Sequence, residues 1–286
     1  MKVVLSPNPY RDKGLRAVQT ADKILKDSGV ETSICLPFRP DETLALPSNV
    51  TIKDIHTEIR RADLLICFGG DGTILHSARL VRPYNIPILG VNLGSVGFMA
   101  ELECSELAML SRLAEKKYTC EKRMMLDVRV MRGGRSIFRD TALNDVVVTK
   151  GAVAREIDVT VTADHVKMVG FSGDGVIVCT PTGSTAYSMS AGGPIVEPTA
   201  ENIIVTPICA HDLKARCCVL GKERVIGVTV SHLARKSAYL SADGGRAFRL
   251  SSDDTVELRM SNQSVRLVRL TDRSFYEILN EKLGKV

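Results

Sequence analysis

The stretch Leu64-Leu65-Ile66-Cys67-Phe68-Gly69-Gly70-Asp71-Gly72-Thr73 determines how the first half of the chain is interpreted. Its five consecutive apolar residues have the length of a buried strand, and the glycines then lead into a helical pattern from Thr73 to Val81. Short apolar runs also occur at 2–5, 32–36 and 87–91, with helical spacings between them. Strands that alternate with helices predict a parallel sheet with helices on both faces.

The periodicity changes after about residue 122. From Leu126 onward apolar and polar residues alternate, and Gly133-Gly134 and Asp243-Gly244-Gly245 offer hairpin turns. Alternation with a period of two is typical of strands that bury one face. The second half is therefore predicted to be mostly antiparallel sheet in a sandwich-like arrangement.

These patterns divide the chain into two expected domains. Residues 1–103 would form an α/β nucleotide-binding domain that carries the glycine-rich turn, and residues 104–270 would form a β-rich domain. A short helical pattern within 271–286 is expected to pack back on the first domain. The chain has 286 residues, of which 44% are hydrophobic, and this suffices for two buried cores.

The composition of the chain says more about its cellular location than about its binding partner. The net charge of +5 suits an anionic small molecule as well as nucleic acid. The apolar start, 1–5, is too short for a signal peptide, and no later stretch has membrane-spanning length. Several of the eight cysteines, such as Cys35, Cys67 and Cys179, fall inside apolar runs, as small core residues do. We therefore expect a reducing, cytoplasmic location, with no membrane partner.

The glycine-rich turn predicts a phosphate site with one added function. Glycines let a phosphate approach the main chain, and the amides at the start of the next helix favour anions. Asp71 would weaken a simple phosphate cradle, so its presence indicates that it accepts a hydroxyl proton or holds Mg²⁺. The dinucleotide-binding motif Gly-x-Gly-x-x-Gly would require glycine at position 75, which is leucine. The P-loop motif Gly-x-x-x-x-Gly-Lys-Ser/Thr does not occur in the sequence. The alternative is a tight turn with an incidental carboxylate.

Two further segments contain polar groups beside strand patterns. Ser172-Gly173-Asp174-Gly175 precedes an apolar run, and Thr180 to Pro194 is then rich in hydroxyls and glycines. Short donors at this density predict a loop that binds a sugar or a phosphate, although a flexible loop would have a similar composition. Asn144-Asp145 interrupts another strand pattern. The pair could accept hydrogen bonds from vicinal ribose hydroxyls, or it could mark a β-bulge.

Together these segments resemble the NAD kinase family. The family's Gly-Gly-Asp-Gly-Thr motif occurs at 69–73, and its Thr-Pro-Thr-Gly-Ser-Thr-Ala-Tyr motif lies within 174–194. Asn144-Asp145 matches an Asn-Glu/Asp pair, and Gly94 to Glu101 resembles a Gly-x-x-Gly-Phe segment. The order and spacing of these motifs agree over roughly residues 60 to 215.

The resemblance implies a kinase that transfers the γ-phosphate of ATP to the 2′-hydroxyl on the adenosine side of NAD, giving NADP. It also implies an active site in the cleft between the two domains, with Mg²⁺ or another divalent cation accompanying ATP. No metal ligands are expected from protein side chains. Members of the family are commonly homodimers or homotetramers whose sites are partly completed by a neighbouring subunit. NAD and ATP would be the partners, and nucleic acid would not.

The resemblance also assigns roles to individual residues. Asp71 matches the general base, and Gly69, Gly70 and Thr73 match the nucleotide loop. The positions that match NAD contacts are Gly72, His76, Asn144, Asp145, Arg155, Asp174, Thr185, Ala186, Tyr187, Ser188, Met189 and Ser190. Phe98 and Asp243 are further candidates. The chain departs from many relatives at Ser172, often an arginine, and at Gly245, often a glutamine.

Some of these residues also have structural interpretations, and two other functions fit part of the sequence. Arg155 could be an ordinary surface residue, His76 a half-exposed structural histidine and Tyr187 a core residue. A lipid kinase of the diacylglycerol type shares the first motif, but it should present an apolar or basic membrane-facing segment. A non-catalytic nucleotide sensor could lose its general base, whereas Asp71 is present here.

Overall fold

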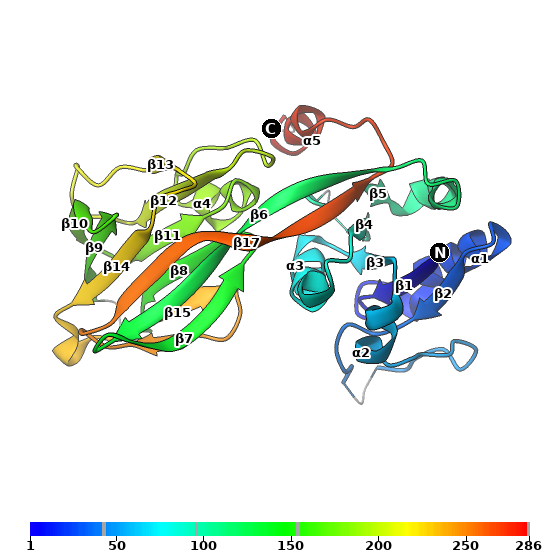
Figure 1. The fold of residues 1–286 in the computed structure, drawn as a ribbon, viewed down its shortest axis with the longest axis horizontal. Coiled ribbons are helices and arrows are strands. Elements are labelled where there is room, and N and C mark those ends of the chain that lie inside the picture. Colours follow the sequence, from blue (N-terminus) through cyan, green and yellow to red (C-terminus); the bar gives the residue numbers. More distant parts are fainter. Residues whose placement is uncertain (42–43, 95–96, 153–154, 285–286) are drawn as a thin grey trace. The chain divides into compact units, whose positions relative to one another are not determined.

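The computed structural model describes residues 1–41, 44–94, 97–152 and 155–284. The chain forms two compact units (Figure 1). Unit 1 comprises Met1–Lys122 and Val265–Val286, and unit 2 comprises Arg123–Ser264. The expected domain boundaries at 103 and 270 both fall inside unit 1.

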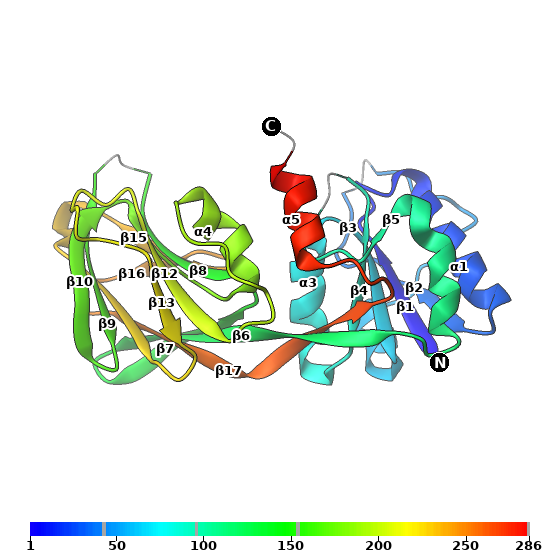
Figure 2. The same cartoon turned by 90° about the horizontal axis from the view of Figure 1, so that it is seen from above.

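Unit 1 is built on a parallel sheet in the order β2-β1-β3-β4, joined at β4 by the end of β17. Every residue of β3 is buried, because helices cover both faces of the sheet. Figure 2 shows α1 on one side of the strands and α3 on the other. The strands are β1 (Lys2–Pro7), β2 (Glu31–Ile34), β3 (Leu64–Gly69), β4 (Ile88–Asn92) and β5 (Leu102–Glu103).

The helices of unit 1 include four α-helices and four 3₁₀ segments among the described residues. The α-helices are α1 (Arg16–Asp27), α2 (Ile55–Glu58), α3 (Asp71–Val81) and α5 (Phe275–Leu283). The 3₁₀ segments are η1 (Lys13–Leu15), η2 (Ile59–Arg61), η3 (Arg82–Tyr84) and η4 (Cys104–Leu113). Helix α3 begins at Asp71 rather than at the expected Thr73, because Gly70 takes the extended N-cap conformation. The carboxylate therefore stands in the first turn of the helix.

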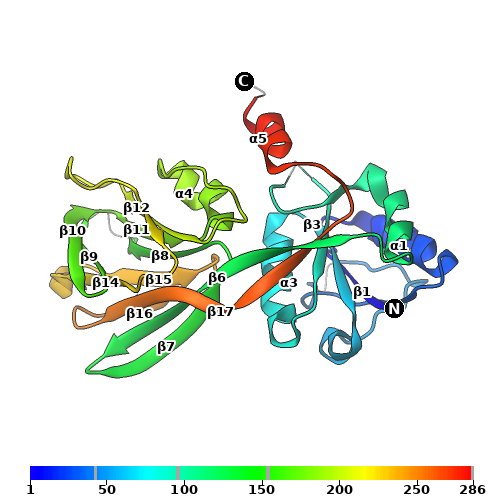
Figure 3. The same ribbon diagram turned by 45° about the horizontal axis from the view of Figure 1, so that its top comes forward.

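Unit 2 contains two sheets (Figure 3). Side chains from both sheets form one core. One sheet runs β13-β12-β11-β8-β15-β16, and all its pairs are antiparallel. The other contains β10-β9-β14-β17 together with β6 and β7. The core includes Leu126, Val148, Val176, Val228 and Leu258, which lie on alternating positions of their strands. The chain leaves unit 1 within β6 and returns within β17.

The strands of unit 2 are mostly short, and the longest connection between them, 180–201, contains two helical segments. The strands are β6 (Thr119–Arg132), β7 (Arg135–Ala142), β8 (Asp145–Lys150), β9 (Ile157–Ala163), β10 (Val166–Gly173), β11 (Gly175–Cys179), β12 (Asn202–Ile208), β13 (Cys218–Gly221), β14 (Ile226–Ser231), β15 (Ala238–Ala242), β16 (Phe248–Leu250) and β17 (Thr255–Arg269). The helical segments are η5 (Thr182–Thr185), α4 (Tyr187–Ser190) and η6 (Leu233–Arg235). The predicted fold class, an α/β unit with a parallel sheet followed by a mostly antiparallel β-rich unit, is confirmed. Within the described ranges, no helix is long and apolar enough to cross a membrane.

Candidate active site

The glycine-rich turn of unit 1 is closely packed. A Cβ atom on Gly69 would lie 2.2 Å from the hydroxyl oxygen of Thr73, so only glycine fits where β3 ends. Thr73 is buried, and its hydroxyl accepts a hydrogen bond from the Asn8 side chain at 3.4 Å. The turn is therefore a fixed structure that brings the end of β1 and the start of α3 together.

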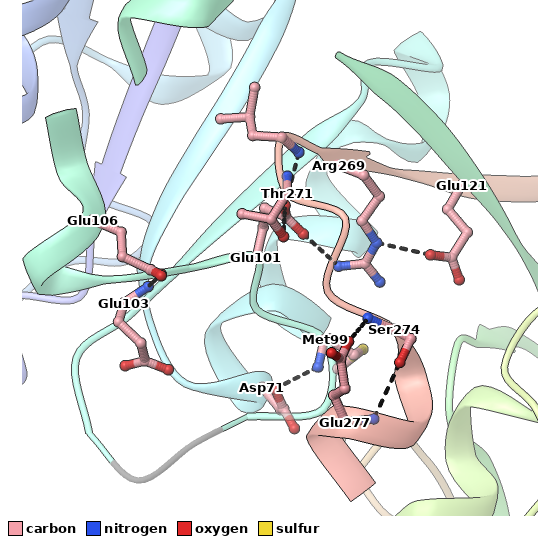
Figure 4. Close-up of polar contacts among 11 residues, drawn as sticks. Asp71, Met99, Glu101, Glu103, Glu106, Glu121, Arg269, Thr271, Ser274 and Glu277 are labelled. Atoms are coloured by element: carbon pink, nitrogen blue, oxygen red, sulfur yellow. Dashed lines mark hydrogen bonds and ion pairs between the residues drawn. The ribbon is translucent and has the colours of Figure 1, made fainter. Parts of the chain in front are cut away.

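The carboxylate of Asp71 is oriented by a neighbouring loop. The backbone N–H of Phe98 donates to one oxygen at 2.9 Å. The backbone N–H of Met99 donates to the other oxygen at 3.2 Å (Figure 4). A Cβ atom on Gly97 would come within 2.3 Å of Oδ1, the carboxylate oxygen that accepts the Met99 N–H, so glycine at 97 leaves room for the acid. The carboxylate thus has a defined direction before any ligand binds. In the resembling segment Gly94 to Glu101, positions 95 and 96 lie outside the described residues.

A cavity of about 380 Å³ lies beside this turn in unit 1. Its described lining residues are Asn8, Arg11, Phe38, Gly70, Gly72, Thr73, His76, Asn92, Leu93 and Gly94. The lining combines glycines at the start of α3, where backbone amides attract anions, with the guanidinium of the exposed Arg11. This combination suits a phosphate group. Asp71 is not among the lining residues described, since its side chain faces Phe98 and Met99.

His76 has both a structural contact and a place on the cavity wall. Its Nε2 lies 2.9 Å from the carbonyl oxygen of Pro37, and its ring is almost perpendicular to that of Phe38, with the centroids 5.9 Å apart. These contacts hold the imidazole in place while it lines the cavity. The two interpretations left open by the sequence are therefore compatible.

No role was predicted for Asn8 and Arg11, although both line the cavity. They follow β1, which pairs in parallel with β3, so the ends of both strands reach the same edge of the sheet. Ligands bind beyond the carboxyl ends of parallel strands. Their position directly after the first predicted strand was the feature of the sequence that could have identified them.

In unit 2, Asp243 fixes the Asn144-Asp145 pair. Its carboxylate accepts the backbone N–H groups of Leu143 at 2.8 Å, Asn144 at 2.8 Å and Asp145 at 3.1 Å. In return, the N–H of Asp243 donates to the carbonyl of Asp145 at 2.9 Å. The backbone of Asp243 has a φ of 47°, a left-handed conformation that aspartate tolerates better than most residues. Asp243 therefore holds the pair by a set of backbone contacts.

Both members of the pair have groups suited to a hydroxyl ligand. Asp145 is 7% exposed, and burial, together with the nearby charge of Asp243, raises the pKa of its carboxyl to about 7. The side-chain oxygen of Asn144 is buried and has no hydrogen-bond partner among the described residues. A buried acceptor without a donor is costly, and a ligand hydroxyl would satisfy it.

The second glycine-rich motif packs directly on this pair. The hydroxyl of Thr180 donates to the carbonyl of Leu143 at 2.6 Å, and its N–H donates to the carbonyl of Asn144 at 2.9 Å. A Cβ atom on Gly183 would lie 2.1 Å from the carbonyl oxygen of Asn144. The structure thus brings the 180–186 loop and the Asn-Asp pair into one site within unit 2.

The remaining candidates of this motif differ in exposure. Ser188 is fully buried and hydrogen-bonds to Thr206 at 2.8 Å, which is a structural contact, and Thr185 is also buried. Tyr187 is 45% exposed, so it is not the core residue that the sequence left open. Ala186 and Met189 are half-buried, and Ser190 is exposed. An exposed aromatic ring beside this loop can stack on a ligand ring.

Three other positions lie elsewhere in unit 2. Asp174 pairs with Lys150, the two charged atoms being 2.6 Å apart. Arg155 is exposed, which leaves both of its interpretations open. Ser172, where many relatives carry an arginine, donates its hydroxyl to Asp158. This serine therefore completes a local contact and presents no cation to a ligand.

An oriented carboxylate at a glycine-rich strand-to-helix turn, beside a cavity suited to phosphate, is an arrangement that fits a nucleotide-dependent kinase. The family model described as the ATP-NAD kinase N-terminal domain matches residues 17–118. The model for the ATP-NAD kinase C-terminal domain matches residues 143–270. The chain belongs to the NAD kinase family, and the resemblance inferred from the motifs is confirmed.

Relatives extend this match over nearly the whole chain. The NAD kinase of Natranaerobius thermophilus is 38% identical over 98% of this chain and 97% of its own length. That of Symbiobacterium thermophilum is 43% identical over 78% of each chain. Among solved structures, yeast NADH kinase complexed with NADH has a TM-score of 0.86 at 26% identity, covering 100% of this chain and 88% of its own. An NAD kinase from Archaeoglobus fulgidus in complex with ATP has a TM-score of 0.72 at 26% identity, with 100% of both chains covered.

Proposed function

We propose that Asp71 is the general base of an NAD kinase reaction in which the γ-phosphate of ATP passes to the 2′-hydroxyl of the adenosine ribose of NAD. As a member of its family, the chain catalyses ATP-dependent phosphorylation of NAD. The observation that carries the assignment is the orientation of Asp71 by two backbone amides in the first turn of α3. The relatives found lend no support to a lipid kinase or to a non-catalytic sensor.

The reaction requires one proton transfer and one in-line displacement. A carboxylate oxygen of Asp71 takes the proton of the ribose 2′-hydroxyl. At the same time the 2′-oxygen attacks the γ-phosphorus, and ADP leaves. Most of the rate comes from alignment of the two substrates and from stabilisation of the phosphoryl charge. Arg11 and the amides at the start of α3 supply positive potential at the phosphates.

A divalent cation would enter with the triphosphate. The described residues contain no group of three or more acidic, histidine or cysteine side chains placed to hold a metal ion. Mg²⁺ suits such a site, because it is commonly held by substrate phosphates and water with one or two carboxylates. When bound, it neutralises part of the phosphate charge. Asp71 lies within the nucleotide loop, 69–73, and its carboxylate would be the protein group available to such an ion.

A coupled assay tests the function directly. Purified protein with ATP, Mg²⁺ and NAD should form NADP, detected by an NADP-specific dehydrogenase. Vesicles that contain diacylglycerol should receive no phosphate from labelled ATP. Binding of NAD with no NADP formed, in enzyme that also binds ATP, would contradict the proposal.

Replacing Arg11 with methionine should weaken the use of ATP. A hydrogen bond to a charged group is typically worth about 1.5–3 kcal/mol, so the KM for ATP should rise at least about tenfold. The KM for NAD should be measured in parallel, because Gly72 and His76, which match NAD contacts, line the same cavity as Arg11. Arg60→Met, another exposed arginine of unit 1, is the matched control and should leave both constants unchanged. An Arg11 variant that behaved like this control would exclude Arg11 from the phosphate site.

NAD binding should depend on pH through Asp145. The ribose hydroxyls donate to an ionised carboxylate, and the pKa of this carboxyl is raised to about 7. Between pH 6 and pH 8 its ionised fraction rises from about one tenth to about nine tenths. The KM for NAD should therefore fall as the pH rises over this range, and Asp145→Asn should remove the dependence. An identical pH profile in the variant would refute the assignment.

Protein stability provides an independent check on the same group. Because the folded pKa lies above the ordinary aspartate value, folding is favoured while the carboxyl is protonated, and that contribution is lost as the pH rises toward 7. The free energy of unfolding attributable to this group should thus decrease between about pH 4 and pH 7. In chemical denaturation, Asp145→Asn should show a flatter profile over this window.

We also propose an assembly and a location for the chain. NAD and ATP are the expected partners, in keeping with the solved relatives that hold NADH and ATP. A homodimer or homotetramer, with a neighbouring subunit completing the site, would use the exposed Tyr187 and the loop around it. Light scattering on the purified chain tests this. A cytoplasmic location is consistent with eight free cysteines, three of which are buried thiols.

A further inference from the structure

The loop that orients Asp71 is itself held by the C-terminal segment of the chain. Glu101 ends this loop, and the residue is only 4% exposed. One carboxylate oxygen accepts the N–H groups of Leu270 at 2.7 Å and Thr271 at 2.6 Å, and the Thr271 hydroxyl at 2.8 Å. The other accepts a guanidinium N–H of Arg269 at 3.0 Å (Figure 4). Hydrogen bonds to a buried charged group are among the strongest in proteins, so this end of the loop is firmly anchored.

The side chain of Phe98 anchors the same loop at a second point. Its ring centroid lies 6.5 Å from that of Phe275, and the ammonium of Lys282 lies 4.0 Å above the ring. Both partners belong to α5, which begins with a capping box at Ser274. Phe98 is also a residue whose N–H donates to Asp71. The C-terminal segment thus contacts the loop at Phe98, which supplies one of the amides that hold the acid, and at Glu101, which follows the other.

We propose that Glu101 is a positioning residue for phosphoryl transfer. Its carboxylate fixes the loop against Arg269 and Thr271, the loop fixes two backbone amides, and these fix the carboxylate of Asp71. Glu101 acts through Asp71 and touches no reacting atom. The inference rests on the proposed function, since it takes Asp71 as the base. A displacement of about 1 Å in a catalytic group can cost about 10²-fold in rate, so a loosened loop should be visible in kcat.

Substitutions at Glu101 give a graded test. Glu101→Ala removes all four contacts and should lower kcat by about 10²-fold, with the KM values for ATP and NAD within about twofold. Glu101→Gln keeps an acceptor for Leu270 and Thr271 but loses the ion pair, so its kcat should fall about tenfold or less. Glu121→Ala is the matched control, because Glu121 also pairs with Arg269, at 2.7 Å, but lies outside the loop. This control should keep kcat within about twofold of wild type.

A double substitution separates positioning from a general loss of stability. In an Asp71→Asn background, Glu101→Gln should cause no further loss of the residual turnover, because the group through which it acts is already removed. The Gln variant retains most contacts, so it supports this comparison even where Glu101→Ala does not fold. A loss in this background equal to that in wild type, or a Glu121→Ala defect as large as that of Glu101→Ala, would overturn the proposal. Full turnover in Asp71→Asn alone would overturn the proposed function instead.

Discussion

Replacing Asp71 with asparagine should reduce kcat by at least about 10²-fold and by as much as about 10⁴-fold, the usual contribution of positioned acid–base catalysis. Asparagine retains the shape of the side chain and can still accept one of the two amides from the 97–99 loop. It cannot accept the proton of the ribose hydroxyl at neutral pH. The NAD dissociation constant, measured by titration calorimetry, should therefore change little while the coupled assay reports the loss.

A matched variant makes this result specific to the site. Asp27→Asn removes an exposed carboxylate from the end of α1 in the same unit and should leave turnover unchanged. Loss of NAD binding in Asp71→Asn, with turnover preserved among the complexes that still form, would show that Asp71 binds the substrate and does not act as a base.

Replacing Gly183 with alanine should both destabilise unit 2 and weaken NAD binding. The new methyl group would lie 2.1 Å from the carbonyl oxygen of Asn144 and 2.5 Å from its carbonyl carbon, so backbone must move. Overpacking of this kind typically costs about 1–3 kcal/mol and occasionally more, which corresponds to a fall in Tm of about 2–12 °C for a chain of this size. The KM for NAD should rise at least about tenfold, because the displaced residues carry the hydroxyl acceptors.

A second glycine in unit 2 provides the control. A Cβ atom on Gly221 would meet only the far end of the Glu223 side chain, at 3.2 Å, and this end can move aside. Gly221→Ala should therefore melt within about 1 °C of wild type, since surface changes of this kind are usually small. If Gly183→Ala melted at the same temperature and bound NAD normally, the close packing of the motif on Asn144 would be refuted.

Local sequence patterns predicted the elements of the fold well. The run 64–68 is β3 almost to the residue, because a continuous apolar run that ends in glycines can hardly be anything but a buried strand and a turn. Period-two alternation likewise marked several strands of unit 2, such as β6, β9 and β15. The start of α3 was placed two residues late, because the pattern could not show that Gly70 would adopt the N-cap conformation. That difference matters, since it puts Asp71 inside the helix.

Contacts between distant residues could not be predicted in the same way. Asp243 reaches the amides of Leu143 and Asp145 across 100 and 98 residues. Glu101 reaches Thr271 across 170 residues. No local periodicity encodes such pairs, because they depend on the order of strands in the sheets, such as the placement of β17 beside β4. The raised pKa of Asp145 follows from the same long-range packing, since it needs burial and a second carboxylate nearby.

Arg11 and Gly97 were missed for different reasons. Arg11 lay outside every recognised motif, although its place after the first strand put it at the binding edge of the sheet. Gly97 lay inside a quoted motif, but its importance is steric and appears only when its distance to the Asp71 carboxylate is known. Residues that act by leaving space give little signal in a single sequence.

The most direct test is a crystal structure of the chain with NAD and a non-hydrolysable ATP analogue. We predict that the 2′-oxygen of the adenosine ribose lies within about 3.2 Å of a carboxylate oxygen of Asp71, the reach of a hydrogen bond to a general base. An adenosine ribose bound elsewhere in every protomer, with Asp71 contacting only the amides of Phe98 and Met99, would contradict this mechanism.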